Sequence, residues 1–208
     1  MLLFGALFLT LSSPLLLAQS PPKGVETATK RDFYPPGTRW KEKKISADGK
    51  SKVVEHVVLD DTEYNSTRVV KVSIGKGKVV KIYDQKTLAF IAHQVGGKDV
   101  MTALPHDGRY NWPLWVGKSW VAPFDFQIAK TKKTIKVDKK YSVTAFETVT
   151  VPAGSFKAYK VVGEPASNTK SSIILWWSPK INKTVKIAHF RGTKNIITYE
   201  LVTIPSLP

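Results

Sequence analysis

The sequence has 208 residues, of which 42% are hydrophobic and 11% aromatic, and its 32 Lys and Arg against 16 Asp and Glu give a formal net charge of +16. This length predicts one domain or at most two small ones, and the apolar fraction excludes a wholly disordered chain. The chain contains no cysteine, which excludes a disulfide framework, a cysteine-ligated zinc site, a thiol nucleophile and a lipidated N-terminal cysteine.

Residues 1–20 carry no charged side chain and are mostly apolar. Ser12 to Pro14 interrupt this run, so it is a poor membrane span and is better explained as a secretory signal peptide. Cleavage after Ala18 would place Leu16 at the −3 position, whereas cleavage after Ser20 gives the better small-x-small pattern but puts Pro21 next to the cut. The alternatives to a signal peptide are a mis-assigned start or an N-terminal strand. We therefore predict an exported protein, periplasmic or extracellular, in which residues 21–32 form a linker.

The rest of the chain alternates short β-type runs with turn-forming clusters. The predicted strands are Thr38–Ile45, Ser51–Leu59, Thr67–Ile74, Lys78–Asp84, Thr87–Gln94, Trp120–Ala129, Thr134–Val137, Tyr141–Val151, Phe156–Val162, Ser171–Trp177, Thr184–Phe190 and Ile196–Thr203. Turns are predicted at Asp48-Gly49, Gly75-Lys76-Gly77, Gly96-Gly97 and Asp138-Lys139-Lys140. The pattern predicts an all-β fold: an antiparallel meander of about 11–12 strands curled into a barrel or half-barrel, with a two-sheet sandwich as the alternative.

We expect residues 33–204 to form a single all-β domain. A Gly-x-x-Trp sequence opens a strand at Gly37–Trp40 and again at Gly117–Trp120. It suggests a weak two-part repeat over 33–103 and 112–203, although two matches of two residues also arise by coincidence.

Two segments show which faces of the sheet are buried. Between Thr134 and Ala145 the apolar side chains alternate with polar ones, which predicts a strand pair with one solvated, lysine-bearing face. Residues 173–177 are instead apolar on both alternations. Such a strand is either covered on both faces or forms one wall of an apolar cavity.

Catalytic patterns are missing from the sequence. The histidines His56, His93, His106 and His189 are not spaced as a metal-binding pair; His93 and His189 fall within strand runs, where we expect them to be hydrogen-bonded sheet residues. There is no nucleophile elbow, phosphate-binding loop or calcium loop. We predict no catalytic residue, no metal and no cofactor.

Residues 105–120 form the most unusual stretch, with three of the six tryptophans. Exposed aromatic rings can bind sugars or lipid interfaces, and an arginine can bind an acidic group. Alternatively, the segment folds back as a lid that closes one end of the barrel. The candidate ligand-binding residues are Arg109, Tyr110, Trp112, Trp115 and Trp120 in this stretch and Trp176 in a strand.

Basic residues are 27 Lys against 5 Arg, and the local concentration is Lys130, Lys132, Lys133, Lys136, Lys139 and Lys140. Specific phosphate and base recognition favours Arg, so the composition predicts diffuse attraction to an anionic envelope polymer and no specific nucleic acid. The alternative is a lysine surface that serves only solubility.

The segments Val149–Lys160, with Val-Pro-Ala-Gly-Ser-Phe, and Trp176–Lys186, with Trp-Ser-Pro after Trp176, resemble motifs of exported bacterial all-β proteins of unknown function. Pro113–Trp120 resembles the same family's strand entry, so the resemblance covers residues 113–203. It implies a secreted, curved antiparallel sheet and supplies no catalytic residue.

These observations predict a non-enzymatic protein that binds an amphiphilic or envelope ligand inside a curved sheet. One alternative is a structural or partner-binding module whose interior is filled by its own side chains. The other is an envelope hydrolase whose acidic pair is brought together only by folding.

Overall fold

The structure is a computed structural model that describes residues 20–59, 62–166 and 169–208. The predicted signal peptide lies outside these residues except for Ser20. The strands are β1 (Arg39–Ser46), β2 (Ser51–Val58), β3 (Thr62–Tyr64), β4 (Thr67–Ile74), β5 (Val79–Asp84), β6 (Phe90–Val95), β7 (Lys98–Leu104), β8 (Ser119–Ile128), β9 (Lys133–Val151), β10 (Gly154–Gly163), β11 (Ser171–Ser178), β12 (Lys183–Arg191) and β13 (Lys194–Ser206). One short 3-10 helix, η1 (Ala129–Thr131), lies between β8 and β9.

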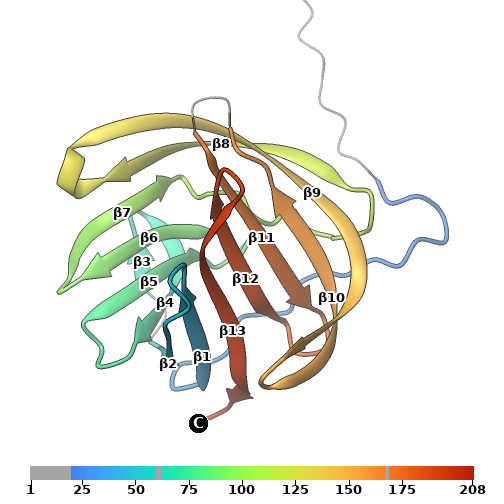
Figure 1. The fold of residues 1–208 in the computed structure, drawn as a ribbon, viewed down its shortest axis with the longest axis horizontal. Helices are drawn as coiled ribbons and strands as arrows, with labels where there is room; N and C mark the ends of the chain where they lie inside the picture. Colours follow the sequence, from blue (N-terminus) through green and yellow to red (C-terminus); the bar gives the residue numbers. More distant parts are fainter. Residues whose placement is uncertain (1–19, 60–61, 167–168) are drawn as a thin grey trace, which may run out of the picture.

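The strands form a closed antiparallel barrel (Figure 1). From β4 to β13 each strand pairs with the next, β13 pairs with β1, and β1 pairs with β2. The ring closes because β2 also pairs with β4, through His56–Val58 and Val72–Ile74. The barrel therefore has 12 strands, with β3 as an extra strand on β4. The prediction of an all-β antiparallel meander closed into a barrel is confirmed.

Strand β9 corrects one predicted turn. Asp138-Lys139-Lys140 does not turn but continues through a 19-residue strand, where it pairs with Val121–Pro123 of β8. Asp138 and Lys140 are exposed, whereas Lys139 points inward and is 8% exposed. Charged residues that alternate with inward side chains are compatible with a strand, so the charge cluster was not a turn signal. Lys139 thus lies inside the barrel, although it was predicted to lie in a turn and in a local concentration of lysines.

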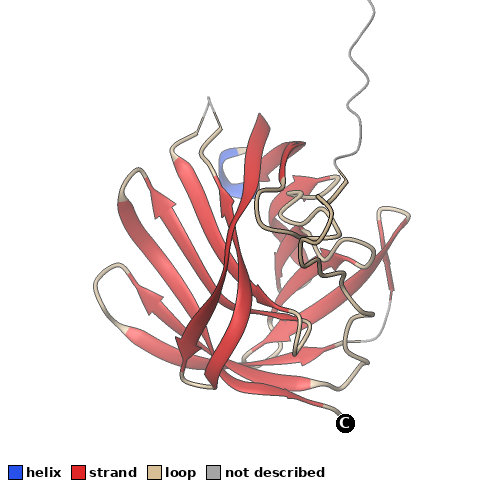
Figure 2. Cartoon of the chain, turned by 90° about the vertical axis from the view of Figure 1, so that its right-hand side faces the viewer, coloured by secondary structure: helices blue, strands red, loops and turns tan. Residues whose placement is uncertain are grey.

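The segment between β7 and β8 closes one end of the barrel. Tyr110 and Leu114 are buried in a cluster with Tyr141 of β9 and Trp177 of β11. The chain before β1 adds to this closure, because Ala28 and Leu114 exchange backbone hydrogen bonds of 2.9 and 2.8 Å. Figure 2 shows these loops gathered on one side of the strands. Of the two alternatives for this segment, the structure agrees with the lid.

A second interior cluster and an outer one add to the packing. Inside the barrel, Trp40, Val72, Val185 and Leu201 pack together with further valines. Ile82 instead belongs to a separate buried group with Val69, Ile91 and Ala92, partly covered by Tyr64 of β3. Within the described residues, no helix is long and apolar enough to cross a membrane.

Candidate functional site

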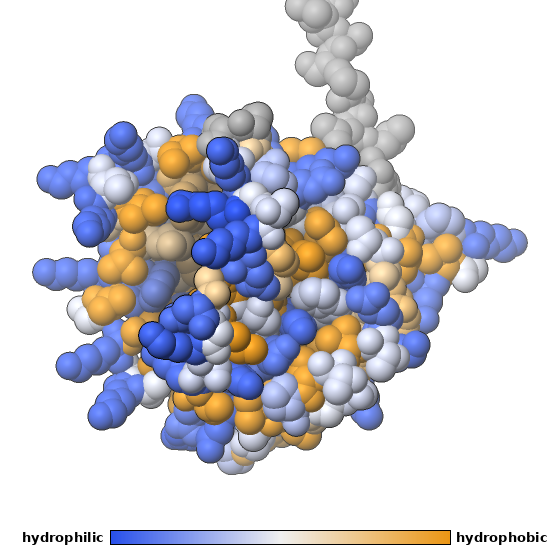
Figure 3. All heavy atoms as spheres, in the orientation of Figure 1, coloured by the Kyte–Doolittle hydropathy of each residue, from blue (hydrophilic) through white to orange (hydrophobic). Residues whose placement is uncertain are grey.

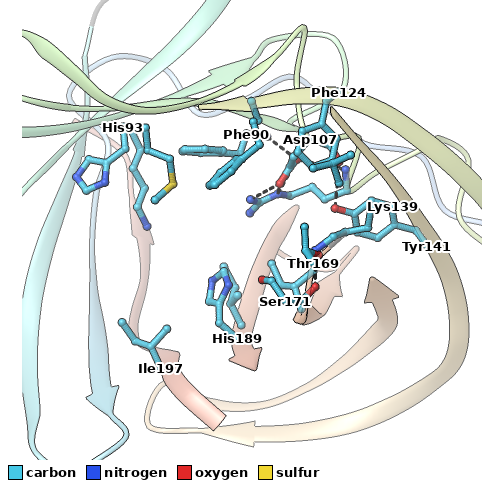
Figure 4. Close-up of a pocket in the computed structure, with 18 of the residues that line it drawn as sticks. Phe90, His93, Asp107, Phe124, Lys139, Tyr141, Thr169, Ser171, His189 and Ile197 are labelled. Carbon is cyan, nitrogen blue, oxygen red and sulfur yellow. Dashed lines mark hydrogen bonds and ion pairs between the residues drawn. The ribbon is translucent and has the colours of Figure 1, made fainter. Parts of the chain in front are cut away.

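The barrel encloses a cavity of about 390 Å³. This volume lies in the range of about 300–1,000 Å³ that is typical of small-molecule sites. Its walls come from β5 to β9 and β11 to β13, with Asp107 and Arg109 contributed by the loop after β7 (Figure 4). The large apolar side chains of the lining are Phe90, Met101, Phe124, Phe126, Ile173, Ile187, Ile196 and Ile197. A filled interior, one of the alternatives from the sequence, is therefore not what the barrel contains.

An arginine–carboxylate pair lies on the cavity wall. Arg109 Nε donates to both carboxylate oxygens of Asp107, at 3.0 and 2.8 Å, and its Nη2 donates to Oδ2 at 2.6 Å. Asp107 Oδ1 also accepts from the backbone N–H of Phe90 at 3.1 Å, and the guanidinium lies over the Phe90 ring. Burial acts to lower the pKa of Arg109, but Asp107 outweighs it and raises that pKa. The pair is thus a nearly neutral unit that fixes the loop to the cavity wall.

Lys81 is the second charged group, and it has no carboxylate partner. It extends from β5 into the cavity, where Nζ lies 4.7 Å from the centroid of the Tyr199 ring. No acidic side chain of the described residues forms an ion pair with it. Burial lowers the pKa of Lys81 to about 8; Glu42 opposes this shift, whereas Arg109 and Lys183 add to it. Near neutral pH, Lys81 is therefore a mostly protonated amine that lacks a counter-charge at hydrogen-bond distance.

Lys139 is the third charged group on the cavity wall. Its Nζ donates to the carbonyl oxygen of Ser171 at 3.0 Å, a single hydrogen bond to a neutral group. Burial lowers the pKa of Lys139, and Asp107 partly opposes this. Among the described lining residues the cations are Lys81, Arg109 and Lys139, whereas Asp107 is the single carboxylate. The cavity is consequently both apolar and electropositive.

Two histidines also face the cavity, and both are uncharged at neutral pH. Burial, together with Arg109 and Lys81, lowers the pKa of His189 to about 3. Burial and Lys81 lower the pKa of His93 in the same direction. Both residues lie in strands, as predicted, but their side chains line the cavity, and His93 Nε2 has no hydrogen-bond partner among the described residues. The described residues contain no group of three or more potential ligands that could hold a metal ion.

A buried ionic cluster lies in another part of the barrel interior. Glu42 accepts from Trp40 Nε1 at 2.8 Å and lies 3.3 Å from both Lys183 Nζ and His56 Nε2. Burial acts to raise the pKa of Glu42, but Lys183, His56 and Lys81 outweigh it and lower that pKa to about 2. Burial lowers the pKa of His56 to about 4 in spite of Glu42. Glu42 is therefore ionised and balanced by Lys183, and it does not neutralise Lys81 at contact distance.

The residues predicted to bind a ligand occupy three different places. Arg109 lines the cavity. Tyr110 and Trp112 stack on each other at the closed end, where Trp112 Nε1 donates to the carbonyl oxygen of Thr87 at 2.9 Å. The Trp120 ring stacks on Tyr141 and donates to the carbonyl oxygen of Gly108.

Trp115 and Trp176 also lie outside the cavity lining. Trp115 is 3% exposed, with Lys118 Nζ lying 4.4 Å from its ring centroid. Trp176 donates to Glu147 at 2.8 Å and carries Lys160 and Lys186 over its ring, on the face of β11 opposite Ile173. Only Arg109 of the predicted set is in the cavity lining.

Sequence reasoning missed Lys81, Lys139 and His189 as cavity residues. For Lys139 the signal was present, because it shares the alternation of Val137 and Tyr141, which was predicted to be the apolar face. The predicted turn hid it.

No protein-family model matches the sequence, and no curated protein matches it. Solved structures are similar to this chain to different degrees. The hypothetical lipoprotein YmcC from Escherichia coli is 9% identical, with a TM-score of 0.50 over 84% of this chain and 90% of YmcC. A candidate exported protein with a YmcC-like fold from Bacteroides fragilis is 15% identical, with a TM-score of 0.49 over 84% of this chain and 99% of its own. A candidate lipoprotein from Parabacteroides distasonis is also 15% identical, with a TM-score of 0.41 over 86% of this chain and 100% of its own. The likeness to YmcC shows a shared fold, and the motifs in residues 113–203 are not tested by it.

Proposed function

We propose that this chain is an exported, non-enzymatic carrier whose barrel holds an anionic amphiphile, such as a fatty acid. One observation carries the proposal: Lys81 enters an apolar cavity without a carboxylate partner among the described residues. A buried cation is costly unless it is paired, so a site of this kind gains from a ligand that brings the missing negative charge. The predicted signal peptide supports export.

The ligand's two parts have complementary surroundings. An acidic head group beside Lys81 would replace water with a charge-assisted hydrogen bond. A hydrocarbon chain would lie against Phe90, Phe124 and Phe126, where each buried methylene contributes about 0.8 kcal/mol. The cavity therefore favours one charged end and one apolar end in the same molecule.

The alternative of a hydrolase with an acidic pair receives no support from the cavity. Asp107 is the one carboxylate among the described lining residues, and Arg109 holds it in a bidentate ion pair. Hydrolysis by the glycosidase mechanism requires two carboxyl groups that flank the reacting bond.

Replacing Lys81 by methionine tests the head-group contact. We expect the Lys81→Met variant to bind a dansyl-labelled fatty acid about 10- to 100-fold more weakly, because a hydrogen bond to a charged group contributes about 1.5–3 kcal/mol. Its affinity for the methyl ester of the same probe should hardly change, since the ester has no charge to lose. Fluorescence titration measures both affinities.

The matched control is Lys157→Met, which removes a lysine from the exposed face of β10. It should bind both probes as the parent protein does. Equal weakening of acid and ester by Lys81→Met would show that Lys81 does not recognise the charge. The absence of saturable binding of either probe to the parent protein would contradict the carrier function itself.

The pH dependence gives an independent prediction. The pKa of Lys81 is lowered to about 8 in the ligand-free protein. Its amine is protonated below this pH and attracts an anion, and it loses that charge as the pH rises. The affinity for the fatty acid should therefore fall above pH 8, by up to about tenfold per pH unit, until the pKa of the ligand-bound amine is reached. The ester in the parent protein, and the acid in Lys81→Met, should show no such fall, and a flat profile in the parent would rule out titration of Lys81.

A further inference from the structure

Six connections between strands lie at one end of the barrel, because successive connections of a meander alternate between its two ends. We call their described residues the mouth loops: 47–50, 75–78, 96–97, 129–132, 164–166 with 169–170, and 192–193. The cavity opens toward them, since Phe126, Thr169 and Ile196, which line it, lie close to these loops in sequence. Figure 3 shows the surface hollowed on this side, with hydrophilic side chains projecting around it.

Exposed cations surround this opening. Nine of them form no ion pair among the described residues. They are Lys76, Lys78, Lys98, Lys130, Lys132, Lys133, Lys170, Arg191 and Lys194. The described acidic residues of the mouth loops are Asp48 and Glu164, which pair with Lys50 and Lys140, and the exposed Asp99 at the adjoining end of β7 is hydrogen-bonded to Tyr64 and Gln94. The mouth is therefore a ring of positive charge with little local compensation.

The opposite end differs. In its described loops, at residues 65–66, 85–89, 105–118, 152–153 and 179–182, the exposed lysines are Lys86 and Lys180, and the segment before β1 adds the exposed Lys23 and Arg31. The other basic residues of these loops are held inside, Arg109 by Asp107 and Lys118 by backbone carbonyl oxygens of Asn111 and Pro113. A lysine surface that served only solubility would not need to concentrate at one end.

Exposed apolar side chains lie among the mouth cations. Val95, Ile128, Ile135 and Ile196 are 44%, 36%, 37% and 40% exposed. They belong to the strand ends next to the mouth loops, and Ile196 also lines the cavity. Cations beside apolar side chains match the surface of an anionic bilayer, where phosphates lie directly above acyl chains. A nucleic acid or a polysaccharide would present the negative charge without the apolar layer.

We infer that the mouth docks on the surface of a bilayer that contains anionic lipids, with the cavity opening toward the membrane. The docking surface lies outside the cavity, so it does not require the cavity to be occupied. If the carrier function also holds, an amphiphile can pass between bilayer and cavity without crossing free water.

The test is sedimentation with vesicles made of equal parts phosphatidylcholine and phosphatidylglycerol. The triple variant Lys130→Gln, Lys132→Gln and Lys133→Gln should bind these vesicles on the order of 100-fold more weakly, since each lysine near an anionic surface contributes roughly a fivefold factor. These residues are exposed at the tip formed by η1, so folding should be unaffected. Binding of the parent protein should fall with added salt and should be lost on pure phosphatidylcholine.

The matched control is Lys23→Gln, Lys86→Gln and Lys180→Gln, which removes the same charge away from the mouth. Equal weakening by the two triple variants would show that net charge alone is responsible and would overturn the proposal. The variant Val95→Ser with Ile128→Ser should weaken vesicle binding about tenfold and leave binding to dextran sulfate unchanged. If it leaves both unchanged, the mouth is a polyanion site rather than a membrane surface. Lys81→Met should bind vesicles as the parent does, so failure of the cavity and failure of the docking surface are separable.

Discussion

Replacing Arg109 by methionine is expected to lower the free energy of unfolding by about 3–5 kcal/mol, because it leaves a buried charge without its partner. Arg109 and Asp107 have side chains that are 11% and 12% exposed and share a bidentate contact. Asp107 also accepts from the backbone of Phe90, so it cannot leave the interior without breaking that hydrogen bond. Urea unfolding followed by tryptophan fluorescence measures the loss.

The control for this prediction is the double variant Asp107→Asn with Arg109→Met. It removes both charges and keeps an acceptor for the Phe90 N–H, so most of the lost stability should return. A loss of less than about 1 kcal/mol in the single variant Arg109→Met is what an exposed ion pair would give, and it would contradict a buried pair of Arg109 and Asp107. If the single and double variants were equally stable, the unpaired Asp107 carboxylate would not be the cause of the stability lost in Arg109→Met.

The fold was largely predictable because apolar and polar side chains alternate along most of the strands. The predicted Thr67–Ile74 coincides with β4, and most of the other predicted runs differ from their strands by one or two residues. Two strands were not predicted. β3 has three residues and exists through its pairing with β4, and β7 starts within the polar sequence after Gly97. Neither has enough local apolar alternation to be recognised without its neighbours.

The site was much less predictable, because its decisive residues look like surface residues in the sequence. Lys81 lies between Val80 and Ile82, which face outward and are covered by the cluster around Val69. A lysine among apolar neighbours would ordinarily mark the solvated face, and only barrel closure reverses this assignment. The tryptophans misled the prediction in the opposite way. Trp112 and Trp120 look like ligand-binding residues in the sequence, yet they pack at the closed end. Chemistry inside a barrel depends on which strands face each other, and local sequence does not contain this information.

The two ends of the barrel differ in packing and in charge. The closed end is stabilised by aromatic stacking and by hydrogen bonds from Trp112 and Trp120 to backbone carbonyl oxygens. The other end leaves the cavity open, and its loops carry charge in place of packing. Under the proposed carrier function, residues that control ligand entry should therefore be sought at the mouth, and residues that control stability at the closed end and in the interior ion pairs.

Replacing Lys183 by methionine should likewise cost about 3–5 kcal/mol at neutral pH, and it should also weaken the dependence on pH of the stability contributed by Glu42. In the parent protein the pKa of Glu42 is lowered from 4.5 to about 2. Its contribution is therefore fully present above pH 4.5 and is lost as the pH falls toward 2. Without Lys183, the burial of Glu42 is opposed only by His56, Lys81 and the Trp40 hydrogen bond, so the pKa of Glu42 rises above its parent value. Less of the stability contributed by Glu42 is then left to lose on acidification.

The measurement is the free energy of unfolding in urea, determined for variant and parent across the acid range. The difference between the two is compared, because the other carboxylates contribute to both proteins alike. This difference should shrink as the pH falls. Lys183 Nζ lies 3.8 Å from the centroid of the Trp40 ring, and methionine keeps an unbranched side chain beside that ring, so the loss reports on charge rather than packing. Adding Glu42→Gln to Lys183→Met should restore most of the stability at neutral pH and make the difference nearly independent of pH. A difference that grows on acidification would mean that Lys183 is not what holds the Glu42 carboxylate in its ionised form.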